Sequence, residues 1–202
     1  SAEDAGCDFE ETQSLTFSDR ADAIIVQLPL PSDISTEDVL NSIPLHQDAD
    51  VLSMAARAKF EHNDAGVLLP PVVGAVREIL AQGNVGVKGK EAVVIGNGWL
   101  VGNPCAVWLK QQGAEVSVVT LESGDLSAAL RAADIIVSGA GSSHLIKPDM
   151  IKDGVVLIDA GASESGGAIV GDADPTCAEK CSVFTPVPGG VGPIAVACLF
   201  EN

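Results

Sequence analysis

The feature that most constrains the fold is a short apolar run that ends directly in a glycine-rich turn. Ala92–Ile95 is wholly apolar, and Gly96, Gly98 and Gly102 follow it before a stretch with helical spacing. A strand buried on both faces needs such a run, and glycines allow the backbone to turn sharply. We therefore expect a strand, a tight turn and a helix in this order.

The same order recurs farther along the chain. Short apolar strands joined by helices form parallel sheets with right-handed crossovers, because the helices then cover both faces of the sheet. The pattern predicts a doubly wound α/β sheet of the Rossmann type. The expected elements are strands at Ala92–Ile95, Glu115–Val119, Ile135–Val137 and Val155–Asp159, and helices at Val101–Gln112 and Leu126–Ala133.

The N-terminal part predicts a smaller α/β lobe. Ala23–Val26 is expected to be a buried strand, Thr36–Ile43 a helix, and Pro71 the start of a linking helix that runs to Ala81. Ile194–Phe200 predicts a final helix. The expected division is an N-terminal lobe over residues 1–70, a Rossmann domain with its linking helix over 71–190, and a C-terminal helix over 191–202 that returns toward the first lobe.

The glycine turn is a candidate site for a dinucleotide phosphate. Gly96, Asn97, Gly98, Val101 and Gly102 lie between the strand and the helix, where glycines admit a diphosphate and the helix N-terminus offers free N–H groups. The third glycine comes one residue later than in the usual G-x-G-x-x-G pattern. The alternative is a turn that serves packing alone.

Residues after the later strands complete this candidate site. Thr120 and Glu122 follow the second strand, where dinucleotide folds bind the adenosine ribose. A carboxylate there accepts bonds from a ribose 2′-OH and repels a 2′-phosphate, so NAD is favoured over NADP; Glu122 as a solvated loop charge is the alternative. Gly139, Gly141 and Gly161 leave room for a flat ring.

Composition excludes several classes of function. The 202 residues carry a formal net charge of -17, so neither nucleic-acid nor anionic-membrane binding is expected. The five cysteines are scattered, so we expect no metal site. No apolar run reaches the roughly 18 residues of a membrane span, and no signal peptide is recognisable, which predicts a cytoplasmic protein.

A set of stretches, read together, resembles the bifunctional methylenetetrahydrofolate dehydrogenase/methenyltetrahydrofolate cyclohydrolase (FolD) family. The resemblance implies oxidation of 5,10-methylenetetrahydrofolate by hydride transfer to a nicotinamide, hydrolysis of the product, and homodimers. The matching stretches are Val26-Gln-Leu-Pro-Leu-Pro31, Asp48-Ala-Asp50, Gly89-Lys-Glu-Ala-Val-Val-Ile-Gly96, Val101-Gly-Asn-Pro104, Ala133-Asp-Ile-Ile-Val137, Gly171-Asp-Ala-Asp174 and Thr185-Pro-Val-Pro-Gly-Gly-Val-Gly-Pro193.

The resemblance also assigns roles to residues. It implies that Gln27 is an amide in the catalytic hydrogen-bond network, that Pro29 borders the substrate, and that Asp50 holds the pterin ring. The rigid loop at Pro188, Gly189 and Gly190 is implied to border folate and nicotinamide. From the residues alone, Gln27 as a turn-bonding amide and Asp50 as a helix cap remain alternatives.

The chain departs from the family pattern at its N-terminus. The family has a catalytic tyrosine and lysine four residues apart, the lysine being tied to the cyclohydrolase step. This sequence contains no tyrosine, and its first lysine is Lys59. We expect that the chain begins just after that lysine's position, which leaves a truncated folate-side lobe and a doubtful cyclohydrolase activity. Asn97-Gly98 replaces the family's Arg-Ser, which again favours NAD.

Two functional hypotheses follow. The first is a folate-linked dehydrogenase that prefers NAD, in which hydride transfer depends on the positioning of two rings. The second is a catalytically silent, dinucleotide-binding or regulatory relative of the same fold.

Overall fold

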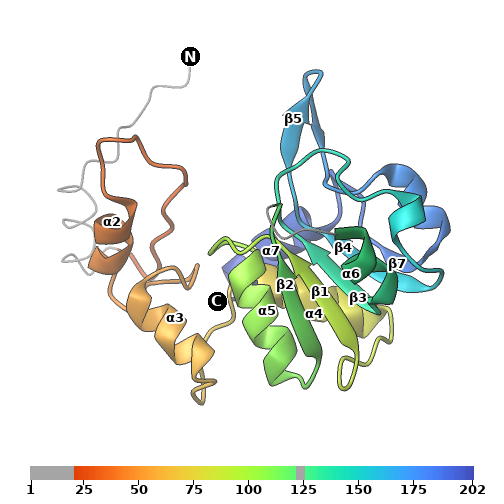
Figure 1. Cartoon of the computed structure of the whole chain (residues 1–202). Helices are drawn as coiled ribbons and strands as arrows, with labels where there is room; N and C mark the ends of the chain where they lie inside the picture. The colour runs from red at the N-terminus through yellow and green to blue at the C-terminus, as the bar shows by residue number, and fades with distance from the viewer. Residues whose placement is uncertain (1–20, 122–125) are drawn as a thin grey trace. The chain divides into compact units, whose positions relative to one another are not determined.

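The computed structural model describes residues 21–121 and 126–202. They form two compact units (Figure 1). One contains the described residues up to Pro70 together with Asn202, and the other is Pro71–Glu201. Each unit has its own apolar core, and each is described on its own below.

A five-stranded parallel sheet is the frame of the Pro71–Glu201 unit. Its strands are β1 (Glu91–Ile95), β2 (Glu115–Val119), β3 (Ile135–Ser138), β4 (Val155–Asp159) and β7 (Cys181–Phe184), in the spatial order β2-β1-β3-β4-β7. Its helices are α4 (Pro71–Gln82), α5 (Gly102–Gln111), α6 (Leu126–Ala132) and α7 (Val191–Glu201), with 3-10 turns η1 (Pro148–Met150) and η2 (Pro175–Glu179). The order reverses after β2, so right-handed crossovers place α5 and α6 on opposite faces. The predicted doubly wound α/β fold is confirmed.

Burial explains why the central strands are apolar throughout. Every residue of β3 and β4 is buried, as is β1 from Ala92 onward, whereas the edge strand β2 has none buried. Val93, Ile136 and Leu157 pack with Leu130 of α6 in one cluster. Each fully buried aliphatic side chain contributes roughly 1.5–3 kcal/mol, so this layer fixes the register of the sheet.

Helices α4 and α7 approach each other very closely. A Cβ atom added to Gly74 of α4 would lie 2.9 Å from Sγ of Cys198 in α7. Only glycine fits at this contact, because a methyl group would displace the buried Cys198 side chain. The first and last helices of the unit are thus packed against each other.

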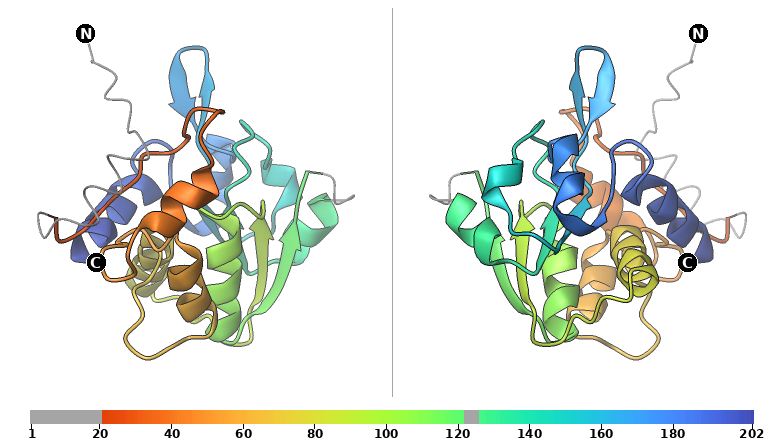
Figure 2. Two further views of the ribbon diagram at one scale, coloured as in Figure 1. Left: turned by 90° about the vertical axis from the view of Figure 1, so that its left-hand side faces the viewer. Right: turned by 90° about the vertical axis from the view of Figure 1, so that its right-hand side faces the viewer.

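A two-stranded antiparallel hairpin was not predicted from the sequence. It consists of β5 (Ser163–Ser165) and β6 (Ala168–Val170), and it projects from its unit in both views of Figure 2. Gly166 and Gly167 at its tip have φ of 61° and 80°, the positive values that a tight hairpin turn requires. The three residues of β5 are all polar and the three of β6 are all apolar, so neither strand shows the alternation from which a half-buried strand is predicted.

The N-terminal unit contains helices α2 (Thr36–Ser42) and α3 (Met54–Glu61). Serine side chains cap both: Ser35 Oγ accepts from Asp38 N at 3.3 Å, and Ser53 Oγ accepts from Ala56 N at 3.2 Å. The core of this unit is a small aliphatic cluster of Ile24, Val26, Val39, Leu40, Ile43 and Leu52.

The buried strand expected at Ala23–Val26 is wrong. Within residues 21–121 and 126–202, a single bridge forms there, between Ile24 and Asp48. Ile24 and Val26 are each 8% exposed, but Ile25 between them is 49% exposed. The segment therefore buries one face only, and the prolines that follow it remove backbone donors that a strand ladder needs.

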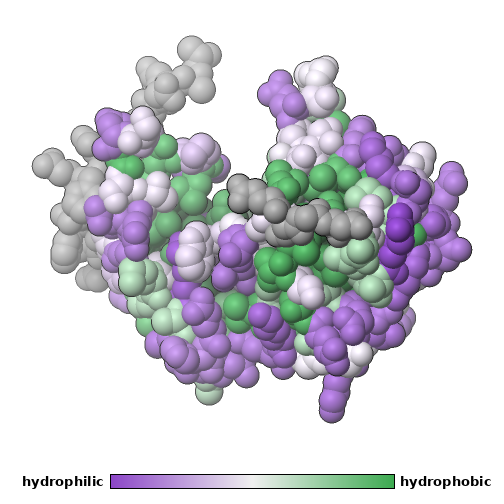
Figure 3. Space-filling model, in the orientation of Figure 1, coloured by the Kyte–Doolittle hydropathy of each residue, from purple (hydrophilic) through white to green (hydrophobic). Residues whose placement is uncertain are grey.

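Polar side chains cover much of the visible surface of the Pro71–Glu201 unit, especially along its lower and right-hand margins in Figure 3. This agrees with the net charge of -17. Within residues 21–121 and 126–202, no helix is long and apolar enough to cross a membrane.

Candidate functional site

The predicted glycine turn lies at the carboxyl end of the sheet, where β1, β3 and β4 end side by side. Gly96 has φ of 92°, and a Cβ atom there would lie 2.8 Å from the Gly139 carbonyl oxygen. A Cβ atom on Gly102 would overlap the Gly96 carbonyl. Backbone therefore packs on backbone at this corner, and only glycine is accommodated at Gly96 and Gly102.

The N-terminus of α5 is not capped by a side chain. Val101 precedes the helix and its side chain makes no cap hydrogen bond, and the first turn contains no acidic residue. Asn97 and Gly98 before it are exposed. In the first turn the Asn103 N–H donates to the Gly98 carbonyl at 3.0 Å, the Cys105 N–H donates to the Val101 carbonyl at 3.1 Å, and Pro104 has no N–H. The Gly102 N–H and the positive end of the helix dipole are the features of this corner that suit a dinucleotide diphosphate.

A cavity of about 420 Å³ lies within the same unit. It brings together five residues predicted for cofactor or substrate, namely Val101, Gly161, Pro188, Gly189 and Gly190. Its lining is largely aliphatic and backbone, which suits a flat ring. Val72, Asp159, Ile169 and Val191 also line it and were not predicted from the sequence.

The proline–glycine loop is held in place by Thr185. Thr185 Oγ1 accepts a hydrogen bond from Asp159 N at 2.7 Å and donates to the Asp159 carbonyl at 3.3 Å. A Cβ atom on Gly190 would lie 2.5 Å from the Pro186 carbonyl oxygen, and Gly189 has φ of 99°. Gly189 and Gly190 are thus required by the tight path of the loop beside β4.

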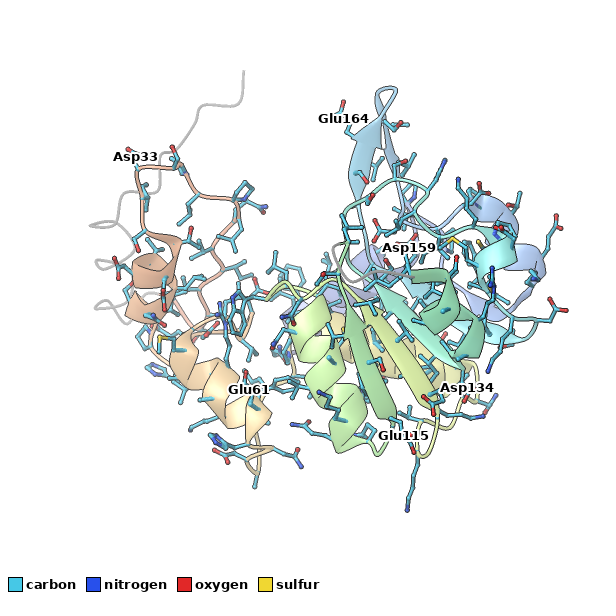
Figure 4. All side chains as sticks on the ribbon, in the orientation of Figure 1. Asp33, Glu61, Glu115, Asp134, Asp159 and Glu164 are labelled. Carbon is cyan, nitrogen blue, oxygen red and sulfur yellow. The ribbon has the colours of Figure 1, made fainter. Side chains whose placement is uncertain are left out.

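Two buried carboxylates lie beneath the loops after β3 and β4. Asp159, labelled at the end of β4 in Figure 4, accepts from Gly161 N at 3.0 Å and from Ala173 N at 2.8 Å. Burial raises the pKa of the Asp159 carboxyl above its usual value, while these bonds oppose the shift. Asp172, which is 0% exposed, bonds the segment after β3.

The folate-side candidates lie in the N-terminal unit. Gln27 is exposed, and its Nε2 donates to the neighbouring Leu28 carbonyl at 3.0 Å. Pro29 is also exposed, and the Leu28–Pro29 peptide bond is cis. The Gln27 side chain thus bonds its own turn in this structure.

Asp50 is half-buried beside a second carboxylate. Burial first, and then the charge of Asp48, raise the pKa of the Asp50 carboxyl above its usual value. Asp48 itself accepts from Leu52 N at 3.1 Å and from Ser53 N at 2.8 Å. Asp48, rather than Asp50, therefore bonds the backbone that enters α3. Val51 has φ of 58°, a strained conformation for a β-branched residue.

Of the other residues predicted for the cofactor site, the structure describes some and not others. Thr120 is exposed directly after β2, and Gly141 is exposed with φ of 63°. Glu122 lies outside the described residues. Across residues 21–121 and 126–202, no group of three or more His, Cys, Asp or Glu side chains could hold a metal ion.

Sequence comparison with known proteins shows which family the chain resembles. Residues 70–202 match the family described as "Tetrahydrofolate dehydrogenase/cyclohydrolase, NAD(P)-binding domain". The chain is 38% identical over 189 residues to "Bifunctional protein FolD" of Aquifex aeolicus, and 39% identical over 190 residues to that of Methanosarcina mazei. It spans 65% and 66% of the lengths of these two relatives, and they cover 93% and 94% of this chain.

Solved structures agree with the sequence comparison. The bifunctional FolD enzyme of Campylobacter jejuni superposes with a TM-score of 0.91 at 37% identity, over 96% of this chain and 69% of that one. The Trypanosoma brucei FolD structure, in complex with NADP cofactor and inhibitor, gives 0.90 at 33% identity, with the same coverage. The NAD-dependent Saccharomyces cerevisiae enzyme, at 19% identity and a TM-score of 0.79, shares the fold. The chain, with its NAD(P)-binding domain, belongs to the tetrahydrofolate dehydrogenase/cyclohydrolase family.

Proposed function

We propose that the protein oxidises 5,10-methylenetetrahydrofolate to methenyltetrahydrofolate by hydride transfer to a nicotinamide cofactor. The observation that carries the proposal is the glycine corner at Gly96 and Gly102, which adjoins an uncapped helix N-terminus and lies in the same unit as an apolar cavity of about 420 Å³. A bound nicotinamide dinucleotide would supply the hydride acceptor. The chain's own residues bind and orient the reactants.

The cofactor residues divide into two groups by chemistry. The Gly102 N–H and the positive dipole end of α5, after Asn97 and Gly98, bind the diphosphate oxygens. Val101, Gly161 and the Pro188–Gly190 segment enclose the ring, because they line the cavity with carbon and backbone atoms only. Apolar enclosure excludes water from the reacting carbon and so favours transfer over side reactions.

On the folate side, Asp50 binds the adjacent N–H donors of the pterin ring. Asp50 is half-buried and takes part in no ion pair among the residues that the structure describes, so its carboxylate has acceptor capacity for such paired donors. Gln27 and Pro29 border the same substrate, with the Gln27 amide turning from the Leu28 carbonyl toward the reacting group. Asp50→Asn is expected to raise KM for the folate without changing the affinity for the dinucleotide.

The preferred cofactor is NAD. Glu122 follows β2 at the position that contacts the adenosine ribose in dinucleotide folds, and its charge repels a 2′-phosphate. Among similar structures, one was solved with NADP and another is NAD-dependent, so both cofactors belong in the test. Glu122→Gln is expected to improve binding of NADP relative to NAD.

The deciding experiment is a spectrophotometric assay of methylenetetrahydrofolate oxidation with NAD and with NADP. Reduction of the nicotinamide that requires the folate, faster with NAD, is the expected result. Decay of the methenyl product in the same cuvette reports cyclohydrolase activity. A folded sample that turns over with neither cofactor would contradict the proposal.

A silent dinucleotide-binding relative is the second candidate, because the exposed Gln27 amide bonds its own turn. It predicts NAD binding without folate-dependent turnover. We also propose that the protein is a homodimer, as the family resemblance implies; sedimentation at the mass of a single chain would contradict this. A cytoplasmic location stays a prediction.

A further inference from the structure

The Asp172 side chain is a buried carboxylate whose two oxygens are both engaged by one short segment. Its Oδ2 accepts from Ser138 Oγ at 2.6 Å and from Ala140 N at 2.8 Å, and its Oδ1 accepts from Ser142 N at 2.7 Å. Asp172 is 0% exposed. In the described part of the chain no lysine or arginine pairs with it. Hydrogen bonds to one loop, rather than an ion pair, therefore stabilise its charge.

That segment supports the glycine corner. The Gly139 carbonyl lies against Gly96, as shown by the 2.8 Å approach of a Cβ atom added there. The side chain of Val101, which lines the cavity, packs on Gly139 so closely that a Cβ atom on Gly139 would overlap it. A shift of the segment must therefore move both Gly96 and Val101.

Asp172 also lies beneath the loop after β4. A Cβ atom on Gly161, which lines the cavity, would overlap the Asp172 carboxylate. The backbone of Asp172 is itself fixed, because its carbonyl accepts from Ile146 N at 2.9 Å. One carboxylate thus contacts the loops after two neighbouring strands without lining the cavity.

We propose that Asp172 is a positioning residue for the dinucleotide: it holds Ser138–Ser142 and Gly161 at the height that the cofactor requires. The inference rests on the proposed function, and it assigns to that function a residue that touches neither reactant. Both oxygens must be acceptors, because three donors converge on them. An asparagine offers one acceptor oxygen, and its amide group would face a donor in either orientation.

The test measures cofactor binding directly, without folate. Titration calorimetry with NAD and with NADP gives Kd for Asp172→Asn, for Ser138→Ala and for the control Asp153→Asn, an exposed carboxylate of the same unit. Thermal unfolding of each variant confirms that the titration is done on folded protein. Steady-state assays then separate KM for the cofactor from kcat.

Asp172→Asn is expected to raise Kd and cofactor KM by about tenfold or more, because a buried N–H loses its acceptor. Ser138→Ala removes one bond but keeps both backbone bonds, so it should raise Kd by only about threefold. Asp153→Asn should bind as the unmodified protein does. A rise in Kd with kcat nearly unchanged is the signature of positioning.

Wild-type Kd in Asp172→Asn, with a lowered Tm, would show a purely structural role and overturn the inference. If Asp172→Asn does not fold, Ser138→Ala decides: a lowered Tm with unchanged Kd likewise overturns it. If the unmodified protein binds neither NAD nor NADP, the proposed function fails as well. If it binds a dinucleotide but does not oxidise the folate, the binding series still tests Asp172.

Discussion

The Thr185 hydroxyl accepts a hydrogen bond from the Asp159 main-chain N–H at 2.7 Å, and so ties the proline–glycine loop to the end of β4. Thr185→Val keeps the shape of this side chain and leaves the Asp159 N–H without its acceptor. We expect the variant to lose about 1–3 kcal/mol of unfolding free energy and to show a higher KM for the cofactor. Urea unfolding and steady-state kinetics measure the two effects. Thr185→Ser, which keeps the hydroxyl, is the control and should remain near wild type.

Gly102→Ala tests the close approach of backbone at the glycine corner. The added methyl group would overlap the Gly96 carbonyl, so we expect a loss of roughly 1–3 kcal/mol in stability and a marked loss of dinucleotide affinity. Gly86→Ala is the matched control, because nothing lies within 4 Å of a Cβ atom there and Gly86 lies in the same unit outside the glycine corner. Equal dinucleotide affinities for the two variants would show that the corner does not form the site.

Asp50→Asn should separate stability from activity. The pKa of Asp50 is raised in the folded protein by burial and by Asp48, so the unfolded chain releases this proton at lower pH. Ionisation of Asp50 therefore costs stability as the pH rises through its folded pKa, and that cost persists at neutral pH. We expect Asp50→Asn to be more stable than wild type at pH 7 while its KM for the folate rises. Chemical denaturation with the exposed Asp33→Asn as control measures the difference.

The raised pKa of Asp50 also sets the acid limit of the proposed reaction. Binding of the pterin needs the carboxylate, which is protonated at higher pH than an ordinary aspartate with a pKa of 3.8. We expect kcat/KM for the folate to fall on acidification before dinucleotide affinity does. A pH profile in which the two quantities fall together would argue against Asp50 as the pterin ligand.

Asp134 provides a pH test at the other end of the sheet from Asp159 (Figure 4). A hydrogen bond from Lys152, at 2.7 Å, lowers the pKa of Asp134, and the Glu91 N–H contributes at 3.2 Å. The resulting stability is present above pH 3.8 and is lost as the pH falls through the lower folded pKa. Lys152→Met should raise the pKa of Asp134 and cost at most about 1 kcal/mol at pH 7, because the pair is solvent-accessible. Carbon-13 NMR titration of the carboxyl group measures the shift.

The central strands and the helices between them could be predicted from the sequence, because strands that are buried on both faces consist of consecutive apolar residues. β1 from Ala92 to Ile95 and β4 from Val155 to Ile158 are buried on both faces and are continuous in apolar residues. β7 could not be predicted in this way, because none of its residues is fully buried. Helix α3 buries only Ala56 and Phe60, so it has no apolar stripe to reveal it.

The carboxylates beneath the cavity were missed for a different reason. Asp172 bonds Ser138 and Ser142, which precede it by 34 and 30 residues. No local pattern carries such a contact, because it depends on which strands become neighbours. The local signal is a glycine close to each aspartate. Gly161, two residues after Asp159, leaves space for the Asp172 carboxylate, and Gly171, directly before Asp172, leaves space for the Asp159 carboxylate.

The contact between Gly74 and Cys198 has a consequence for the architecture of the Pro71–Glu201 unit. Because Gly74 lies near the start of α4 and Cys198 near the end of α7, the polypeptide enters and leaves this unit at one corner. A unit whose ends adjoin can be inserted into a loop of another domain without disturbing its sheet. Its two ends can also be joined by a linker, with new termini placed in a surface loop. A circular permutant that is opened at the Gly166-Gly167 tip is therefore expected to unfold in a single cooperative transition, like its parent.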